Sequence, residues 1–449
     1  MKKIYRIFKL WGKIMDKLFK LKENKTNAKT EILAGFTTFM TMAYILAVNP
    51  LILSATGMDP KAVFTATCIA SAIATLFMAI LANLPIALAP GMGLNAFFAF
   101  TVVLGMGYSW QLALTAVFLE GIVFILLSLF NFREFIVKAI PIEIKKAAAC
   151  GIGLFIAYIG LKNSGIVTYL LPTTNNPLDV VQTLGNISNG QALLAIIGLI
   201  ITIILLVLRV KGALLIGIIL TTLIGIPLKI TMINDNFKLF SLPSAPLFLK
   251  FQFDKIFTFD FFVVFFTFFF VDVFDTIGTL SGLAAEAGLM NKEGNIYNVK
   301  KALLSDAIGT AVGAMVGTST VTSYIESAAG ISEGGKTGLT SLTVSILFFL
   351  SLFISPIFLI IPSAATAPAL IVVGFFMITA IKDIDFTNFE IGIPAFLTII
   401  MMPLSYSIAE GLIFGIISYV LIKLVRGKFK ELSPVTIIIA IIFILKHAL

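Results

Sequence analysis

Long apolar stretches, separated by short polar ones, make up most of the chain. Many of them are about 20 residues long, which is the length of an α-helix that crosses a bilayer. They are continuous rather than alternating, so the pattern argues against a membrane β-barrel. We therefore expect an all-α polytopic membrane protein.

Fourteen apolar segments can be distinguished, two of them irregular. They are residues 31–54, 62–82, 86–102, 109–130, 141–161, 191–209, 212–232, 259–283, 299–316, 318–329, 336–355, 362–381, 390–407 and 409–425. A last apolar piece, Val435–Leu445, is too short to span and is expected to be interfacial or re-entrant.

The second half of the chain repeats features of the first half in the same order. The first set is Ile140-Pro141, Gly153 and Phe155, and the second set is Ile361-Pro362, Gly374 and Phe376. Seven segments per copy is an odd number, so the second copy must be inverted in the membrane. Two inverted repeats of seven segments are typical of secondary transporters.

The two irregular segments occupy corresponding places in the two halves. Prolines and glycines break the segment Leu84–Phe100, and glycine, serine and threonine weaken Gly317–Gly330. In hydrocarbon, broken backbone is tolerated only where protein or a cavity satisfies its hydrogen bonds. The paired interruptions therefore predict a binding site at these two segments.

Charge is scarce, at 12% of the residues, although the formal net charge is +9. Ten Lys/Arg residues precede Thr30 in a tail that lacks the apolar core of a signal peptide. Most of the other basic residues lie at the edges of apolar segments. The expected partner of this charge is the lipid bilayer, not nucleic acid.

The positive-inside rule predicts a cytoplasmic N-terminus in the cell membrane. Basic residues follow the even-numbered segments at Arg133, Lys138, Lys145, Lys146, Arg209, Lys211, Lys292, Lys300, Lys301, Lys423, Arg426, Lys428 and Lys430. Four lysines in the expected outer loops fit less well, namely Lys229, Lys238, Lys250 and Lys255.

Few residues suit metal, redox or nucleotide chemistry. Cys68 and Cys150 lie in apolar segments, and the single histidine is His447. We expect no disulfide, metal site or cofactor. No nucleotide-binding G-x-x-x-x-G-K-[ST] motif occurs, so an ATP-driven pump is not supported.

Isolated carboxylates are the strongest functional signal. Asp272 and Asp275 lie one helical turn apart within an apolar run, and Glu326 lies in the second irregular segment. A carboxylate in a membrane helix costs about 2.5–3.5 kcal/mol on insertion scales. We expect Asp275 to bind a ligand because small residues follow it, although an aspartate bonded to Thr276 would explain the pattern structurally.

Other polar and aromatic residues are weaker candidates. Asn95 could present its amide to a polar ring, and Phe97 or Phe98 could stack on a flat ligand. Glu120 and Asp306 also lie in apolar runs, where they could carry protons. For these two carboxylates, a role in helix packing is the preferred interpretation.

Four runs taken together resemble the AzgA-like purine permeases, a branch of the nucleobase:cation symporters related to uracil and xanthine permeases. They are Thr30–Pro50, Ala89–Phe98, Asp272–Thr279 and Gly317–Gly330. The resemblance implies two inverted repeats divided into core and gate domains. It also implies short β-like stretches in segments 3 and 10, with the substrate bound between them.

The resemblance also implies domain boundaries. They are 1–30 for a basic cytoplasmic tail, 31–139 and 259–361 for the core, 140–258 and 362–425 for the gate, and 426–449 for a C-terminal tail with a short apolar segment.

The resemblance assigns roles to individual residues. It points to Asp275, Glu326 and Phe97 as substrate-binding residues. The residues themselves add Asn95, Tyr324 and Thr279 as further substrate-binding candidates, and the proton-coupling candidates are Asp275, Glu326 and Asp272. Uracil-type relatives have a Glu-His pair where this chain has Asp275-Thr276, and Thr279 follows one turn later instead of a histidine. Proton handling is therefore expected to rest on carboxylates.

The expected function is import of a purine nucleobase by proton symport, with guanine or hypoxanthine preferred. Adenine preference, sodium coupling and a homodimer stay open, and a sulfate-type anion transporter is the nearest competitor. A channel would need a continuous polar face. An intramembrane aspartyl protease needs aspartates on two helices, whereas Asp272 and Asp275 share one. An enzyme is therefore not expected.

Overall fold

The structure is a computed structural model that describes residues 15–129, 142–170, 181–188, 190–233, 237–289, 297–434, 436–437, 440–441 and 443–444. Several expectations fall wholly or partly outside these ranges, namely the tail up to residue 14, Arg133, Lys138, Ile140-Pro141, Lys292 and parts of Val435–Leu445.

Helices within the described ranges confirm the all-α polytopic class. Nine of them are long and apolar enough to cross a membrane, and three shorter apolar helices cover Met92–Gly105, Ala213–Gly225 and Phe389–Leu404. The expected segments 299–316 and 318–329 belong to neither group, so the count of fourteen stays a prediction.

The chain folds as two compact units, each built from separate stretches of sequence. Unit 1 comprises Met1–Asn95, Ser109–Arg133 and Phe240–Ser355, and unit 2 comprises Ala96–Tyr108, Glu134–Leu239 and Pro356–Leu449. The expected core and gate roles, with their boundaries, stay predictions.

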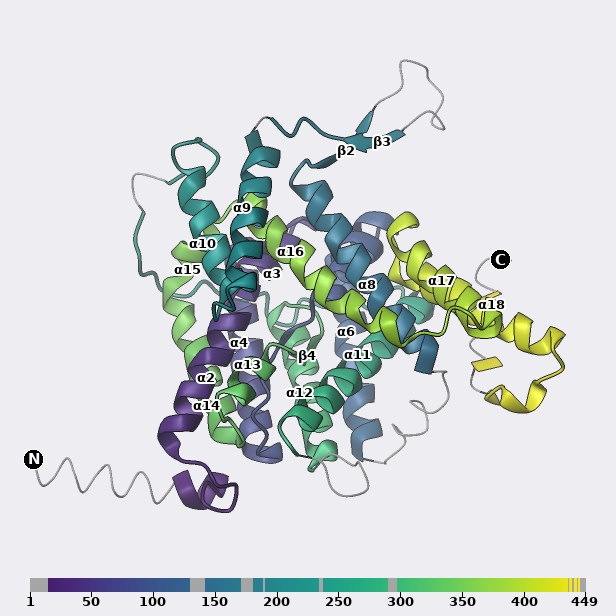
Figure 1. The fold of residues 1–449 in the computed structure, drawn as a ribbon, viewed down its shortest axis with the longest axis horizontal. Helices are drawn as coiled ribbons and strands as arrows, with labels where there is room; N and C mark the ends of the chain where they lie inside the picture. Colours follow the sequence, from purple (N-terminus) through teal and green to yellow (C-terminus); the bar gives the residue numbers. More distant parts are fainter. Residues whose placement is uncertain are drawn as a thin grey trace, which may run out of the picture. The chain divides into compact units, whose positions relative to one another are not determined.

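Unit 1 holds both carboxylate-bearing segments. Its elements are α2 (Ala28–Met42), α3 (Ile45–Ser54), α4 (Pro60–Phe77), the π-helix η1 (Met78–Ala82), β1 (Leu88–Pro90), α5 (Met92–Ala96), α6 (Trp110–Leu129), α11 (Phe259–Glu286), α12 (Val299–Val316), β4 (Val321–Ser323), α13 (Ser327–Ser332), α14 (Gly338–Ser351) and the 3-10 helix η4 (Leu352–Ile354). Helix α14 lies beside α2 and α4 (Figure 1), and α12 packs on α4 and α6.

Unit 2 contains the remaining elements. They are the π-helix η2 (Phe97–Gly105), α8 (Ile142–Asn163), β2 (Val167–Leu170), β3 (Val181–Leu184), α9 (Gly190–Val207), α10 (Ala213–Gly225), α15 (Ser355–Leu359), α16 (Ser363–Ile378), η5 (Thr379–Asp383), α17 (Phe389–Leu404), α18 (Ile408–Val425) and η6 (Phe429–Glu431). The antiparallel pair β2–β3 was not anticipated. Its short Val-Thr-Tyr-Leu run has the β-branched and aromatic residues that favour strands.

Small residues let the helices of each unit approach closely. Along α4, Ala66, Ala70 and Ala74 recur every four residues and are fully buried. A Cβ added to Gly309 of α12 would lie 2.5 Å from the Cβ of Ala74. Close contact between small residues is how membrane helices gain packing energy without a hydrophobic driving force.

The repeat-related glycines of unit 2 face one another. A Cβ on Gly153 of α8 would lie 2.7 Å from the carbonyl oxygen of Gly374, and a Cβ on Gly374 of α16 would lie 2.4 Å from that of Gly153. The two residues that the sequence paired by repetition therefore form a backbone-to-backbone contact where α8 meets α16.

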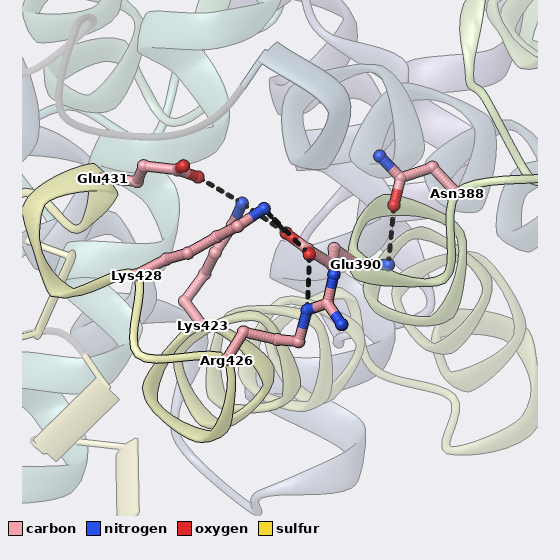
Figure 2. Close-up of polar contacts among 6 residues, drawn as sticks. All are labelled: Asn388, Glu390, Lys423, Arg426, Lys428 and Glu431. Atoms are coloured by element: carbon pink, nitrogen blue, oxygen red, sulfur yellow. Dashed lines mark hydrogen bonds and ion pairs between the residues drawn. The ribbon is translucent and has the colours of Figure 1, made fainter.

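A cluster of ion pairs in unit 2 joins the start of α17 to the end of α18 (Figure 2). The Glu390 carboxylate accepts hydrogen bonds from Lys423 Nζ at 2.9 Å, Arg426 Nε at 2.9 Å and Lys428 Nζ at 2.8 Å. Lys423 also contacts Glu431, and this ammonium holds the pKa of the Glu431 carboxyl below its usual value. The side chains of Glu390 and Lys423 are only 12% and 8% exposed, so their pair is weakly screened by solvent.

We predict that Glu390→Gln destabilises the protein more than Arg426→Gln does. A hydrogen bond to a charged group contributes about 1.5–3 kcal/mol, and Glu390 receives three of them. The Arg426 side chain is 64% exposed, and exposed ion pairs contribute only about 0.2–1 kcal/mol. Melting temperatures of both variants in one detergent test this order, and an equal or larger loss for Arg426→Gln would contradict it.

Candidate functional site

The two irregular segments of unit 1 meet as a short antiparallel ladder. Strand β1 pairs with β4, with Leu88 opposite Ser323, Ala89 opposite Thr322 and Pro90 opposite Val321. This pairing confirms the expected β-like stretches in the third and tenth segments. All residues of both strands are buried. Because each strand pairs with the other, part of the backbone N–H and C=O groups of both strands find hydrogen-bond partners there.

Two threonine hydroxyls brace this ladder in the same way from its two sides. Thr75 of α4 accepts from the backbone N–H of Leu88 at 3.0 Å and donates to its carbonyl at 3.0 Å. Thr310 of α12 does the same to Val321, at 3.2 and 2.9 Å. Helices α4 and α12 would be the second segments of the two expected repeats, and these matching hydrogen bonds agree with that expectation.

Hydrogen bonds beyond the ladder fix the residues that follow it. The Tyr324 N–H donates to the carbonyl of Ala87 at 3.0 Å, and the Tyr324 hydroxyl donates to the carbonyl of Pro90 at 2.6 Å. The Ala87 N–H donates to the Ser327 hydroxyl at 3.0 Å. Tyr324 was expected to touch substrate; the structure places its hydroxyl on the backbone of β1, and the substrate contact stays a prediction.

Glu326 lies half-buried between β4 and α13. Its Oε1 atom accepts a hydrogen bond of 2.6 Å from the hydroxyl of Tyr44, which lies between α2 and α3. The Thr41 hydroxyl also lies 3.3 Å from the Glu326 carbonyl oxygen. The carboxylate is thus positioned by the first segment of the chain as well as by its own segment.

Asp275 of α11 is the second half-buried carboxylate of this region. Its Oδ2 atom lies 3.5 Å from the hydroxyl of Thr322 in β4, and it interacts electrostatically with Glu326. Thr279 is half-buried one turn further along α11. Asp275 and Glu326 are thus close enough to interact, and their expected role in substrate binding stays a prediction.

Three other carboxyl groups meet deeper in unit 1. Asp272 of α11, Asp306 of α12 and Glu120 of α6 are all fully buried. The Thr276 hydroxyl lies 3.3 Å from Asp272 and 3.1 Å from both oxygens of Asp306, and Glu120 lies close enough to both aspartates to interact with them electrostatically. We call Glu120, Asp272 and Asp306 the acidic triad.

Hydroxyl groups connect the acidic triad with the second irregular segment. Thr320 donates to Glu120 at 2.8 Å. The hydroxyls of Thr276 and Thr322 are 2.9 Å apart, and Thr322 is the residue that contacts Asp275. A chain of polar groups therefore runs from Asp275 to the triad. Within the described ranges, no group of three or more His, Cys, Asp or Glu side chains is arranged so that it could hold a metal ion.

Asn95 and Phe97 lie on either side of the division between the two units. Asn95 is fully buried in unit 1, and its carbonyl oxygen accepts a hydrogen bond from Ser319. Its amide nitrogen has no hydrogen-bond partner among the residues that the structure describes. Phe97 begins η2 in unit 2, and its expected role stays a prediction.

Sequence reasoning missed three features of this region. Tyr44 was overlooked, although it is the one phenol within the run Thr30–Pro50. Thr322 was treated only as a weak helix former. Glu120 and Asp306 were considered separately, because their distance in the sequence gives no sign that α6, α11 and α12 bring them to Asp272.

Comparison with known proteins identifies the family. The Xan_ur_permease model, described as "Permease family", matches residues 29–414. The guanine/hypoxanthine permease PbuG of Bacillus subtilis is 46% identical over 96% of this chain and 99% of its own length. The adenine permease AdeP of Escherichia coli is 42% identical over 96% of each chain.

Solved structures show the same fold at low sequence identity. The transmembrane domain of the cyanobacterial bicarbonate transporter BicA has a TM-score of 0.63 and 16% identity, covering 86% of this chain and 97% of BicA's domain. SLC26A9 has a TM-score of 0.62 and 13% identity, covering 87% of this chain and 65% of its own. With a family match over most of its length, this multi-pass membrane chain belongs to the permease family, a family of transporters and not of enzymes.

Proposed function

We propose that this protein imports purine nucleobases across the cell membrane by proton symport, with guanine and hypoxanthine as preferred substrates and the N-terminus in the cytoplasm. The observation that carries the proposal is the pair of half-buried carboxylates, Asp275 and Glu326, beside the β1–β4 ladder. The similarity to PbuG, a guanine/hypoxanthine permease, and to AdeP, an adenine permease, supports the purine class.

The hydrogen-bonding edge of a 6-oxopurine suits these groups. Guanine and hypoxanthine present an N1–H donor next to a carbonyl, and guanine adds an exocyclic amine. A carboxylate accepts hydrogen bonds from such N–H groups, and Glu326 has further lone pairs besides the one that accepts from Tyr44. The amide nitrogen of Asn95 is a donor of the kind that a purine carbonyl requires.

Adenine preference is the alternative within this class. Adenine lacks the N1–H donor but carries an exocyclic amine that a carboxylate can accept. Both PbuG and AdeP are similar to this chain at comparable identity, so identity does not discriminate between them. The pair of carboxylate acceptors favours substrates that have the additional ring N–H.

Proton coupling is supported by the acidic triad. Glu120, Asp272 and Asp306 are fully buried, and Glu120 interacts electrostatically with both aspartates. Three carboxylates held together in a buried site repel one another strongly unless they bind protons or cations. We infer that the triad holds the transported proton, and that Thr276 and Thr322 link it to Asp275.

An anion transporter of the same fold is less compatible with this site. BicA shares the fold and carries bicarbonate, whereas Asp275 and Glu326 would repel an anion at close range. Neutral purines with N–H donors avoid this repulsion. The fold alone is compatible with either substrate, so the preference for a base rests on the two carboxylates.

Expression in a bacterium that lacks purine uptake should restore accumulation of radiolabelled hypoxanthine. Unlabelled guanine should compete strongly and adenine less, because adenine lacks the N1–H and carbonyl edge of a 6-oxopurine. Uracil has an N–H and carbonyl edge but lacks the imidazole ring of a purine, and sulfate is an anion, so neither should compete. A protonophore should abolish accumulation while ATP is still present. Normal expression without uptake of any purine would refute the proposal, and accumulation driven by sodium would refute proton coupling.

Substitutions should separate the two groups of carboxylates. Glu326→Gln and Asp275→Asn each remove an anionic acceptor that contributes about 1.5–3 kcal/mol, so substrate binding should weaken about tenfold or more. Asp272→Asn and Glu120→Gln should leave binding and counterflow nearly intact but abolish uphill accumulation. Binding, counterflow and accumulation are measured on each purified variant in liposomes.

Asp260→Asn is the matched control for these variants. Asp260 lies exposed in the first turn of the same helix α11, so its amide variant should behave as wild type in all three assays. Wild-type binding in both Glu326→Gln and Asp275→Asn would overturn the assignment of the substrate site. Proton-driven accumulation in both triad variants would overturn the role of the triad.

A further inference from the structure

Tyr44 lies at the junction of the two helices that make up the first span. Helix α2 ends at Met42 and α3 begins at Ile45, and together they form the span Ala28–Ser54. The Tyr44 side chain is only 1% exposed and is among the largest fully buried side chains of the described chain. A buried phenol hydroxyl needs a hydrogen-bond partner, and the identity of that partner indicates its role.

The partner of Tyr44 is the Glu326 carboxylate, and tight packing holds the two together. The hydroxyl donates to Oε1 at 2.6 Å. Helix α13, which follows Glu326, packs against α2 so closely that a Cβ on Gly330 would lie 2.1 Å from Thr38 Oγ1 and 2.5 Å from the Ala34 carbonyl oxygen. This packing of α13 on α2 keeps Glu326 close to Tyr44.

Comparison with Tyr324 shows what distinguishes the hydrogen bond of Tyr44 from that of an ordinary buried tyrosine. Tyr324 is also buried, but its hydroxyl donates to a backbone carbonyl of β1, which does not ionise. Tyr44 instead donates to an ionisable side chain that is half-buried and therefore reachable by a ligand. A carboxylate has about four lone-pair sites, so the phenol occupies one and leaves acceptor sites for a substrate.

We propose that Tyr44 is a positioning residue for substrate recognition, because its hydroxyl orients Glu326 and favours the ionised carboxylate that accepts N–H donors. This role rests on the proposed function and extends the substrate site to the first segment of the chain. A hydrogen bond donated to a carboxylate stabilises its charged form. Loss of the hydroxyl should therefore weaken binding most at acidic pH, where Glu326 is more readily protonated.

The test is Tyr44→Phe, which removes one hydroxyl and keeps the ring. Guanine binding and uptake are measured in liposomes between pH 5 and 8 for wild type, Tyr44→Phe, Glu326→Gln and the double variant. Tyr44→Phe should raise KM about tenfold with little change in kcat, and should shift the acid limb of binding toward neutral pH. In the Glu326→Gln background the same change should have little further effect, because the two residues act together.

Two further proteins keep the test independent of folding. Tyr419→Phe removes the hydroxyl of a buried tyrosine in unit 2 and should leave KM and the pH profile unchanged. A 3-fluorotyrosine at position 44 keeps the size of the side chain and makes the phenol a stronger donor. It should shift the acid limb of binding in the direction opposite to that of Tyr44→Phe.

The outcomes distinguish this role from the proposed function. No purine transport by the wild-type protein would overturn both. Normal purine transport with an unchanged KM and pH profile in Tyr44→Phe would overturn the role of Tyr44 alone. Equal losses from Tyr44→Phe in the presence and absence of Glu326 would show that the phenol acts only through packing, which would also overturn it.

Discussion

The need to satisfy backbone hydrogen bonds inside hydrocarbon is the constraint on which the rest of unit 1 depends. Two segments break within the apolar part of the chain, and each unsatisfied backbone group there would cost several kcal/mol. Pairing of β1 with β4, with Thr75 and Thr310 on the backbone of Leu88 and Val321, provides the missing partners. The two interrupted segments can therefore remain buried, because each supplies hydrogen-bond partners for the backbone of the other.

Carboxyl groups are arranged around this crossing in two sets with different surroundings. Asp275 and Glu326 are half-buried, whereas Glu120, Asp272 and Asp306 are fully buried. In the proposed function, the half-buried set exchanges partners with the substrate, and the buried set binds the proton. The Thr276–Thr322 contact lies between the two sets, so a change of charge in one set can be transmitted to the other.

The sequence predicted the parts of this fold that leave a local signature. Proline, glycine and isolated carboxylates marked the two broken segments, and repetition paired Gly153 with Gly374, which the structure brings into contact. The Tyr44–Glu326 contact and the acidic triad depend on how separate helices cross. No local pattern encodes such crossings, because residues such as Glu120 and Asp272 look alike whether they face a partner or pack alone.

Coupling between base and proton is the central claim, and it is tested most directly by proton movement in liposomes that contain a trapped pH-sensitive dye. With no initial pH gradient, addition of hypoxanthine outside should acidify the interior of vesicles that carry the wild-type protein, while bicarbonate or sulfate should not. The account predicts that Asp272→Asn abolishes this acidification but still exchanges labelled base. Entry of hypoxanthine without any proton movement in the wild-type protein would contradict it.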